Sequence, residues 1–313
     1  DKGFIKIISP IDDTPADKAG IQAGDYITHL NGDSVVDMNL KEAIDIMRGE
    51  VGTSITLTII RGTEEPFDVE LIRDTIKMAS VKHRVLNDVG VLRVSTFNEQ
   101  TTSGLKDSIQ ELEESENPPI GYVLDLRNNP GGLLTESVSV SDLFLEQGEI
   151  VSIRGREKKD VQVFSAKKGD LINQKPLVVL INEGSASASE IVAGALQDHD
   201  RAVIMGMKSF GKGSVQTIVP IDSGAIRLTI AKYYTPSGDS IQAVGIEPDV
   251  VVPRAELNII DNYFTFRESD YQDALDNETT DGSEEEATST DILEKDYQLS
   301  RAVDAVKTIA VLN

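Results

Sequence analysis

Four short segments within the first 73 residues have the composition and periodicity of β-strands, and one segment between them, Leu40 to Arg48, has helical spacing. The turn residues agree, because Asn31-Gly32 is a hairpin signal and Gly52 interrupts the chain after the helical segment. The expected strands are Phe4 to Ile8, Tyr26 to Leu30, Ser54 to Ile60 and Phe67 to Ile72. Residues 1–73 are therefore predicted to form a small β-rich module.

From residue 74 to residue 255 the pattern changes to apolar runs bounded by turn residues, with helical stretches between them. The runs are Val89 to Val94, Ile120 to Leu126 and Pro176 to Asn182, and the helical stretches are Glu99 to Glu114 and Leu133 to Phe144. Strands that alternate with helices predict a layered, mainly parallel sheet, so the expected fold class is mixed α/β. In open sheets of this kind, sites form where strands end and helices begin.

The negative charge of the chain is concentrated towards its C-terminal end. The net charge is −23, and residues 256–296 hold 14 acidic and 2 basic residues. The centre of this stretch, Asn277 to Thr290, has almost nothing to bury, so we expect 256–296 to be an acidic, partly disordered linker. A solvated spacer is the favoured interpretation, and an interaction tail is the alternative. Apolar residues at helical spacing then predict an amphipathic helix over 297–313 that needs a surface to dock on.

Composition excludes several classes of protein. A chain of 313 residues is long enough for two or three domains. It has no Cys, which excludes a thiol nucleophile, a disulfide framework and a zinc site built on Cys. The acidic balance argues against nucleic-acid or anionic-lipid partners, and no apolar run approaches the length of a membrane span. Because the chain begins with Asp1, we take it as part of a longer precursor whose signal segment is not in view.

The first motif that carries chemistry is Asp125-Leu-Arg-Asn-Asn-Pro-Gly-Gly132, directly after an apolar strand. Two glycines after a proline let backbone N–H groups turn towards an anion, since no Cβ blocks the approach. That is the geometry of an oxyanion hole. The motif taken alone is also explained as a turn followed by a helix start.

The second motif is Glu183-Gly-Ser-Ala-Ser-Ala-Ser-Glu190, again directly after an apolar strand. A serine at a strand-to-helix turn, surrounded by Gly and Ala, exposes its Oγ near the positive end of the following helix. The alternative is that these serines and alanines are capping and packing residues.

A nucleophilic serine needs a base, and the chain has few candidates. There are three histidines: His29 lies in the first module, and neither His83 nor His199 has an Asp relay at local spacing. A Ser-His-Asp triad therefore lacks support from the sequence.

Lys212, in Phe210-Gly-Lys-Gly213, is the alternative base, provided that burial lowers its pKa. Moving a lysine pKa from ~10.4 to ~7.5 costs about 4 kcal/mol, which an apolar pocket can impose. Lys212 precedes an expected strand over Ser214 to Pro220, and in an extended segment Gln216 lies on the same side. Gln216 would then orient the neutral amine.

A phosphate-binding loop is the competing interpretation of the same turn. Gly206 to Lys212 follows an apolar strand and matches most of that pattern. However, Gly213 stands where the magnesium-binding Ser or Thr is required, and the residues after it alternate as a strand instead of forming a helix. Both features disfavour a nucleotide site.

The first module resembles the PDZ family in the run from Ser9 to Ile27 followed by Asn31-Gly32. The resemblance implies that a peptide is bound as an added strand beside one helix, Leu40 to Arg48. Leu40 and Arg48 are the candidate peptide-binding residues. The family's glycine-containing carboxylate loop is missing from the start of this chain.

Three motifs in order resemble those of the carboxyl-terminal processing proteases, also called tail-specific proteases. They are Asp125 to Gly132, Gly184 to Ile191 and Phe210 to Gln216. The resemblance runs from the PDZ-like start to about Pro253 and implies a crotonase-like serine protease domain over 74–255. It implies that Ser187 is the nucleophile, that Lys212, 25 residues later, is the base, and that Gln216 is the third catalytic residue. The oxyanion hole that it implies is formed by Ala188 with Gly131 and Gly132. Asp198 matches a position that is often acidic, and a structural role is expected there.

The expected reaction is acyl transfer through a Ser187 acyl-enzyme, with no metal or cofactor. The resemblance implies protein or peptide substrates with free C-termini, and a PDZ module that either recruits substrate tails or gates the site. It further implies a bacterial cell envelope or periplasmic location and allows a homo-oligomer. Two other classes stay open: a pseudoenzyme whose function is peptide binding, and a crotonase-like acyl-transfer enzyme that acts on a thioester.

Overall fold

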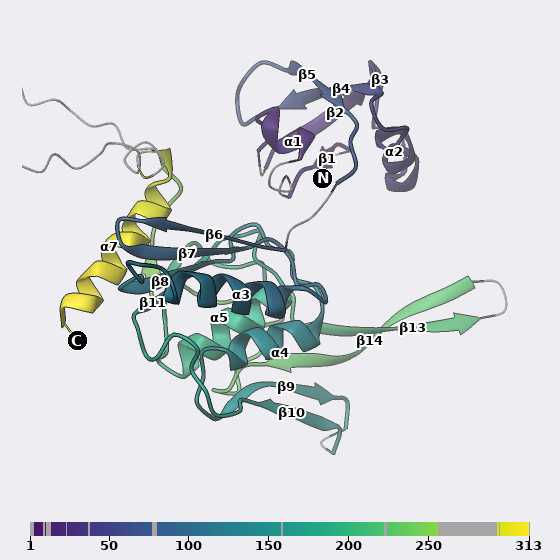
Figure 1. The fold of residues 1–313 in the computed structure, drawn as a ribbon. Coiled ribbons are helices and arrows are strands. Elements are labelled where there is room, and N and C mark those ends of the chain that lie inside the picture. Colours follow the sequence, from purple (N-terminus) through teal and green to yellow (C-terminus); the bar gives the residue numbers. More distant parts are fainter. Residues whose placement is uncertain are drawn as a thin grey trace, which may run out of the picture.

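The computed structural model contains two groups of elements, an N-terminal module with one small sheet and a larger part with two sheets (Figure 1). It describes residues 3–8, 10, 14–22, 24–36, 38–76, 80–157, 159–221, 224–255, 293 and 295–312. Most of the acidic linker expected over 256–296 lies outside the described residues. Within the described part of the chain, no helix is both long and apolar enough to cross a membrane.

The N-terminal module is a small antiparallel sheet with two helices. Its strands are β1 (Ile5–Lys6), β2 (Tyr26–Leu30), β3 (Asp33–Ser34), β4 (Ser54–Ile60) and β5 (Phe67–Ile72), and its helices are α1 (Pro15–Lys18) and α2 (Leu40–Met47). The strand order is β1-β2-β4-β5, with β3 paired to β2. Helix α2 begins with a capping box between Asn39 and Glu42, which explains why the chain turns helical there. Alternate residues of β4, including Ile55 and Leu57, are buried in the module's own core.

The larger part is organised around a six-stranded sheet in the order β15-β12-β11-β8-β7-β6. The strands are β6 (Val81–Leu86), β7 (Val89–Val94), β8 (Gly121–Asp125), β11 (Leu177–Ile181), β12 (Val203–Gly206) and β15 (Val250–Val251). All neighbours are parallel except β6, which pairs antiparallel with β7. The central strands β8 and β11 are buried along their whole length, as expected for parallel strands covered on both faces.

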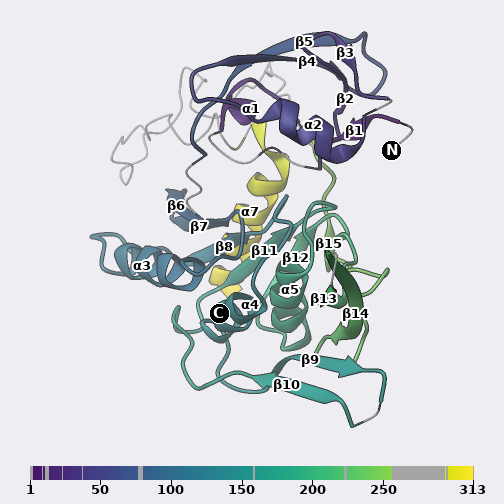
Figure 2. The ribbon, with the colours of Figure 1, turned by 90° about the vertical axis from the view of Figure 1, so that its right-hand side faces the viewer.

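Helices cover both faces of this sheet. The bounds are α3 (Thr101–Glu113), α4 (Leu134–Asp142), α5 (Ala188–Asp198) and α7 (Tyr297–Leu312). Helices α3, α4 and α5 pack into the larger core on one face, and α7 covers the other face over β8 and β11 (Figure 2). The buried stripe of α7 includes Leu299, Val303 and Val306. The amphipathic helix predicted at the end of the chain thus docks on the sheet.

A second sheet in the order β10-β9-β14-β13 extends from the larger part. Its strands are β9 (Glu149–Gly155), β10 (Val161–Ser165), β13 (Ser214–Ile221) and β14 (Gly224–Tyr234), all antiparallel to their neighbours. Strands β13 and β14 project from the body as a two-stranded ribbon (Figure 1). Strand β13 forms the edge of this sheet, and its first residue follows Lys212 by two positions. The sequence pattern predicted β13 but not β9, β10 or β14.

Candidate active site

Ser187 lies in the turn between β11 and α5. The strand ends at Ile181 and the helix begins at Ala188, so Ser187 is the residue directly before the helix. Its backbone has φ 56° and ψ −109°, which is unusual for a residue other than glycine. Such a conformation costs free energy that the surrounding structure must supply, and strained turns of this kind expose nucleophilic serines. The side chain is half-buried beside the positive end of α5.

The Gly131–Gly132 turn passes directly beside Ser187. A Cβ on Gly131 would lie 2.6 Å from the carbonyl oxygen of Ala186 and 2.9 Å from the Cβ of Ser187. A Cβ on Gly132 would lie 2.0 Å from the carbonyl oxygen of Phe97. The φ angles of the two glycines are 97° and 153°, a region that side chains disfavour. Glycine at both positions is therefore what allows this backbone to approach the nucleophile.

Two backbone N–H groups in this turn region are available to an anion. The N–H of Gly131 is occupied, because it donates to Asn129 Oδ1 at 2.9 Å. Within the described part of the chain, the N–H groups of Gly132 and Ala188 have no acceptor. A Cβ on Gly131 would lie 2.9 Å from the nitrogen of Ala188, so the glycine turn and the Ala188 amide are close neighbours. Free backbone donors beside a serine are the type of group that stabilises a developing negative charge.

Asn129 holds the glycine turn against the nucleophile turn. The residue is fully buried, and its Nδ2 donates to the carbonyl oxygen of Val94 at 2.9 Å. Its own carbonyl oxygen accepts from the N–H of Ala186 at 3.0 Å and from the Ser189 hydroxyl at 2.9 Å. A buried amide with this many satisfied groups fixes its neighbours in one arrangement.

A second pair of side chains, Asn128 and Asn182, ties the same two turns together. Asn182 Oδ1 accepts from the N–H of Asn128 at 2.7 Å and from the N–H of Gly184 at 3.0 Å. Asn182 Nδ2 in turn donates to Asn128 Oδ1 at 2.6 Å. Asn128 has φ 57°, a left-handed conformation that Asn tolerates better than most residues.

Glu190 joins the nucleophile segment to the lysine segment. It is a completely buried carboxylate in the first turn of α5. One oxygen, Oε2, accepts from the N–H of Ser187 at 2.7 Å and from the N–H of Lys212 at 2.9 Å. The other, Oε1, accepts from the hydroxyl of Ser209 and from the N–H of Gly211, both at 2.6 Å. Because four donors converge on it, the charge is compensated without a cation.

Sequence reasoning did not assign roles to Asn129, Asn182 and Glu190. A signal was present for Glu190, since it is the one charged residue in the otherwise small or apolar stretch from Ala188 to Leu196. A charge at a position that helical spacing buries must have partners. Nothing in the local sequence shows that those partners come from residues 209–212.

Lys212 and Gln216 are placed differently from the expectation. The sequence interpretation required Lys212 to be buried, but its side chain is exposed, and so is that of Gln216. Within the described part of the chain, the Lys212 amine has no hydrogen-bond or ion-pair partner, whereas its backbone is held by Glu190. The physical reason is that β13 is an edge strand, so no neighbouring strand covers the segment that enters it. The expected apolar pocket around the lysine is thus not formed in this structure.

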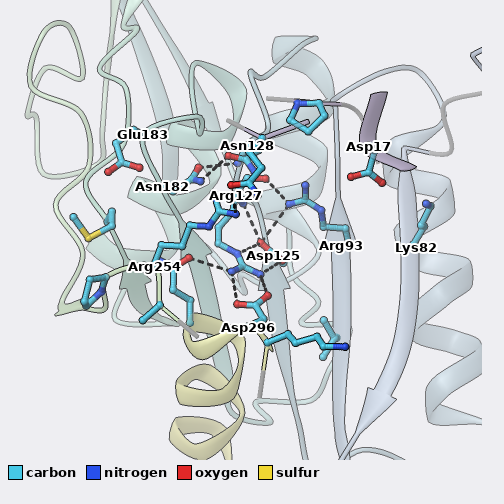
Figure 3. Close-up of a pocket in the computed structure, with 18 of the residues that line it drawn as sticks. Asp17, Lys82, Arg93, Asp125, Arg127, Asn128, Asn182, Glu183, Arg254 and Asp296 are labelled. Atoms are coloured by element: carbon cyan, nitrogen blue, oxygen red, sulfur yellow. Dashed lines mark hydrogen bonds and ion pairs between the residues drawn. The ribbon is translucent and has the colours of Figure 1, made fainter. Parts of the chain in front are cut away.

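Asp125 and Arg127, at the carboxyl end of β8, form a buried ion pair below the glycine turn (Figure 3). Arg127 Nε lies 2.9 Å from Asp125 Oδ1, Arg127 Nη2 lies 2.7 Å from Oδ2, and Arg93 Nη1 lies 3.3 Å from Oδ1. Burial alone would raise the pKa of Asp125, but the charges of Arg127 and Arg93 and the hydrogen bonds of Arg127 outweigh it and hold that pKa well below its usual range. The carboxylate is therefore ionised at any physiological pH.

A cavity of about 970 Å³ lies between the N-terminal module and the larger part. Figure 3 shows that Arg127, Asp125 and Asp296 face it from one side, with Asp17 of the N-terminal module on another. Gln22 and Arg254 approach each other across it, at 3.5 Å between Arg254 Nη2 and Gln22 Oε1. The two groups of elements thus meet close to the Asn128 turn.

The histidines do not assemble a triad with Ser187. His199 lies at the opposite end of α5 from Ser187, and its Nε2 contacts the carbonyl oxygen of Glu149 at 2.7 Å. His83 Nε2 lies 3.6 Å from a carboxylate oxygen of Glu111, and His29 belongs to the N-terminal module. In the described ranges, no group of three His, Cys, Asp or Glu residues is arranged to hold a metal ion.

Asp198 has a structural contact, as expected for it. Its Oδ2 accepts from the N–H of Ser237 at 2.8 Å and so ties the end of α5 to the turn after β14. The competing phosphate-loop interpretation also fails here, because the residues after Gly206 lead into strand β13 and not into a helix.

The two candidate peptide-binding residues of the N-terminal module lie at opposite ends of α2. Leu40 is the first residue of the helix and is 64% exposed, and Arg48 directly follows its last residue and is also exposed. Among the described strands, β1 pairs with β2 alone, so no described strand occupies its other edge, the position where an added strand would pair.

Comparison with known families follows this geometry. Residues 88–252, more than half of the chain, match the family model of peptidase family S41. The chain belongs to peptidase family S41. Residues 6–61 match the PDZ domain family, so the chain combines a β-rich PDZ region with an S41 protease domain. The resemblance stated from the three motifs is confirmed.

Among curated relatives, a carboxy-terminal-processing protease of Bartonella bacilliformis is 57% identical over 256 residues, which are 80% of this chain and 59% of that protein. A probable CtpA-like serine protease of Staphylococcus epidermidis is 39% identical over 272 residues, 85% of this chain and 55% of that protein. The chain therefore spans a little over half the length of the relatives it matches.

Among solved structures, the photosystem II D1 C-terminal processing protease superposes with a TM-score of 0.69 at 32% identity, over 80% of this chain and 69% of that one. A putative S41 protease from Bacteroides fragilis superposes with a TM-score of 0.53 over 80% of this chain and 74% of that one. At 19% identity the second match supports the fold alone.

Proposed function

We propose that this chain is the PDZ and catalytic part of a serine endopeptidase that cleaves proteins near their C-termini. Ser187 is the nucleophile, Lys212 the general base and Gln216 the residue that orients the lysine. The observation that carries the proposal is the Glu190 carboxylate, which binds the backbone N–H groups of both Ser187 and Lys212 through one oxygen. A shared acceptor keeps the two segments within a few ångströms of each other, as a Ser-Lys pair requires.

The free amides beside Ser187 support acyl transfer as the reaction. Neutral Lys212 takes the hydroxyl proton as Ser187 attacks a peptide carbonyl, and the tetrahedral oxyanion accepts from the N–H groups of Ala188 and Gly132. Gly131 contributes its conformation and not its amide, since that amide is bonded to Asn129. Lys212 then gives the proton to the leaving amine, and water hydrolyses the acyl-enzyme. Every step is carried by groups of this chain and by water.

The exposed position of Lys212 implies a resting arrangement. The described residues do not form the apolar surroundings that the proposed base needs, so something has to cover Lys212 before it acts. A bound substrate segment supplies that cover, and the PDZ module either delivers the tail or gates the site by moving between two positions. The cavity between the two parts leaves room for such movement.

The proposed substrate class is a protein or peptide with a free C-terminus, in keeping with the names of the two processing proteases. We assign recognition of the tail to the open edge of β1 beside α2, with Leu40 and Arg48 at its two ends. The domain limits at residues 73 and 255, the periplasmic location and a homo-oligomer stay predictions from the resemblance.

The test compares the wild-type chain with Ser187→Ala and Lys212→Ala, and with Lys208→Ala as the control. Lys208 is a nearby surface lysine paired with Glu247 at 2.6 Å. Each protein is incubated with a set of unfolded protein substrates, and mass spectrometry locates the cuts relative to the C-terminus. We expect cuts near the tail with the wild type and the control, and none with the two site variants. Retained cleavage by either purified site variant would overturn the assignment.

A second candidate function is a silent site with peptide binding as the activity, and the exposed Lys212 is the observation that favours it. A fluorophosphonate probe with substrate peptide present separates the two. Labelling of the wild type but not of Ser187→Ala supports the peptidase, and absence of labelling in both supports the binding protein.

A further inference from the structure

Arg127 connects helix α7 to the turn that carries one of the two proposed oxyanion amides, that of Gly132 (Figure 3). On one side it forms the bidentate pair with Asp125. On the other, Arg127 Nη1 lies 2.8 Å from Asp296 Oδ1 and Nη2 lies 2.7 Å from Asp296 Oδ2. Arg127 Nη1 also donates to Gln298 Oε1 at 3.1 Å. Residues about 170 positions apart in sequence thus share one guanidinium.

The backbone of Arg127 is held as firmly as its side chain. Its N–H donates to Asp125 Oδ1 at 3.0 Å, and its carbonyl oxygen accepts from Arg93 Nη1. The next residue, Asn128, begins the turn that is clasped by Asn182 and ends at Gly132. A shift of the guanidinium therefore moves the first residue of the turn that presents the oxyanion donor.

Asp296 has its position set by the docking of α7. It caps the helix, because its Oδ1 accepts from the N–H of Leu299 at 3.1 Å. The helix itself is anchored by the apolar stripe over β8 and β11 and by Gln298, whose Nε2 donates to the carbonyl oxygen of Val252 at 2.7 Å. A rigid helix thus places one carboxylate against Arg127.

Arg127 is paired with two carboxylates, those of Asp125 and Asp296, and its side chain is only 14% exposed. Burial would lower the pKa of Arg127, but the two aspartates outweigh it and raise that pKa. Neutralising Asp296 removes one of these two carboxylates from a largely buried guanidinium, and the Arg127 side chain then has to find a new arrangement.

We propose that Asp296 is a positioning residue for catalysis: through Arg127, the C-terminal helix holds Asn128 to Gly132 in the geometry that presents the oxyanion amide. This inference rests on the proposed function, because it needs an oxyanion at that amide. It makes catalytic competence depend on a docked α7.

The experiment uses Asp296→Asn and Asp296→Ser in the full chain. Both replacements are good helix N-caps, so α7 keeps its start while Arg127 loses the negative charge of Asp296. The control is Asp304→Asn, which lies in the same helix and pairs with Arg301 at the surface at 2.9 Å. Steady-state cleavage of a tail peptide gives kcat and KM, and hydrogen–deuterium exchange follows the amides of 128–133 and of 297–312.

We expect kcat to fall at least tenfold in both Asp296 variants, with KM changed less than twofold and with faster exchange at 128–133. The control is expected to match the wild type in all three measurements. A wild-type kcat with either Asp296 variant overturns the inference. So does a loss of kcat without faster exchange at 128–133, or with exchange faster throughout α7, because a merely structural role then explains it.

The two proposals fail separately. If Ser187→Ala still cleaves the peptide, the proposed function fails and the Asp296 variants carry no weight. If Ser187→Ala is inactive and the Asp296 variants keep the wild-type kcat, the proposed function stands and the positioning role is wrong.

Discussion

The two halves of the candidate site are held in different ways. Ser187 and the glycine turn are enclosed by buried polar groups, with Asn129 and Glu190 both completely buried. Lys212 is held only by its backbone, and its side chain extends into solvent at the edge of the second sheet. The fold therefore preorganises the proposed nucleophile and the proposed oxyanion donors, whereas the proposed base depends on something that covers it.

Glu190 contacts both halves of the candidate site, so its replacement is expected to have the largest effect on stability and on cleavage. In Glu190→Gln, a side-chain NH2 group replaces one carboxylate oxygen, and it cannot accept a hydrogen bond. The buried N–H groups that donated to that oxygen therefore lose their acceptor. We expect the free energy of unfolding to fall by about 4 kcal/mol and peptide cleavage to fall at least a hundredfold. Urea denaturation and steady-state kinetics measure the two effects.

The matched control for Glu190→Gln is Glu136→Gln, because Glu136 is a carboxylate in the first turn of α4 that accepts from Thr102 at the surface of the same core. That variant is expected to lose about 1 kcal/mol and to keep its activity. An unfolding free energy for Glu190→Gln within 1 kcal/mol of the wild type would contradict the role given to the buried carboxylate.

Asp125→Asn tests the half of the site that contains Ser187 and the glycine turn, because it leaves two arginines without the carboxylate that they share. We expect a loss of about 3 kcal/mol in the free energy of unfolding at pH 7. The pKa of Asp125 is depressed in the folded chain, so its stabilising effect is complete above the ordinary carboxyl pKa and is lost only as pH falls through the folded value.

Denaturation curves from pH 8 down to pH 3 check this sign. The difference between wild type and Asp125→Asn should be constant from pH 8 to about pH 5 and should shrink only at lower pH. A difference that already shrinks between pH 8 and pH 6 would show that another group controls the effect.

Lys212→Met is expected to have the smallest effect on stability and so tests the exposed half. The side chain touches no partner among the described residues, and its removal should change the free energy of unfolding by less than about 0.5 kcal/mol. Cleavage should nevertheless be lost, since the proposed base is gone. Thermal unfolding in the absence and presence of a tail peptide is the measurement, and a stability loss above 1 kcal/mol without peptide would mean that Lys212 is already packed in the resting chain.

The sequence pattern predicted the strands and helices whose own residues show clear apolar spacing. The run Val89 to Val94 is an observed strand with those same bounds, and α7 follows the apolar spacing seen in the sequence. Strand β6 was not predicted, because it carries Lys82, His83 and Arg84 in a row, which hides its periodicity. Strands β9 and β14 were not predicted either, and they pair with each other although they are far apart in the chain.

The sequence by itself determined which groups are chemically competent: a serine before a helix, glycines that permit close backbone approach, and a lysine in place of a histidine. These are properties of residue type and local spacing. Only the tertiary structure decided that the Gly132 amide is free while that of Gly131 is bonded, that Glu190 receives donors from residues 209–212, and that Lys212 is uncovered. The reason is that the burial of a residue and its hydrogen-bond partners depend on segments that are distant in sequence. A local sequence pattern does not show which distant segment packs against it.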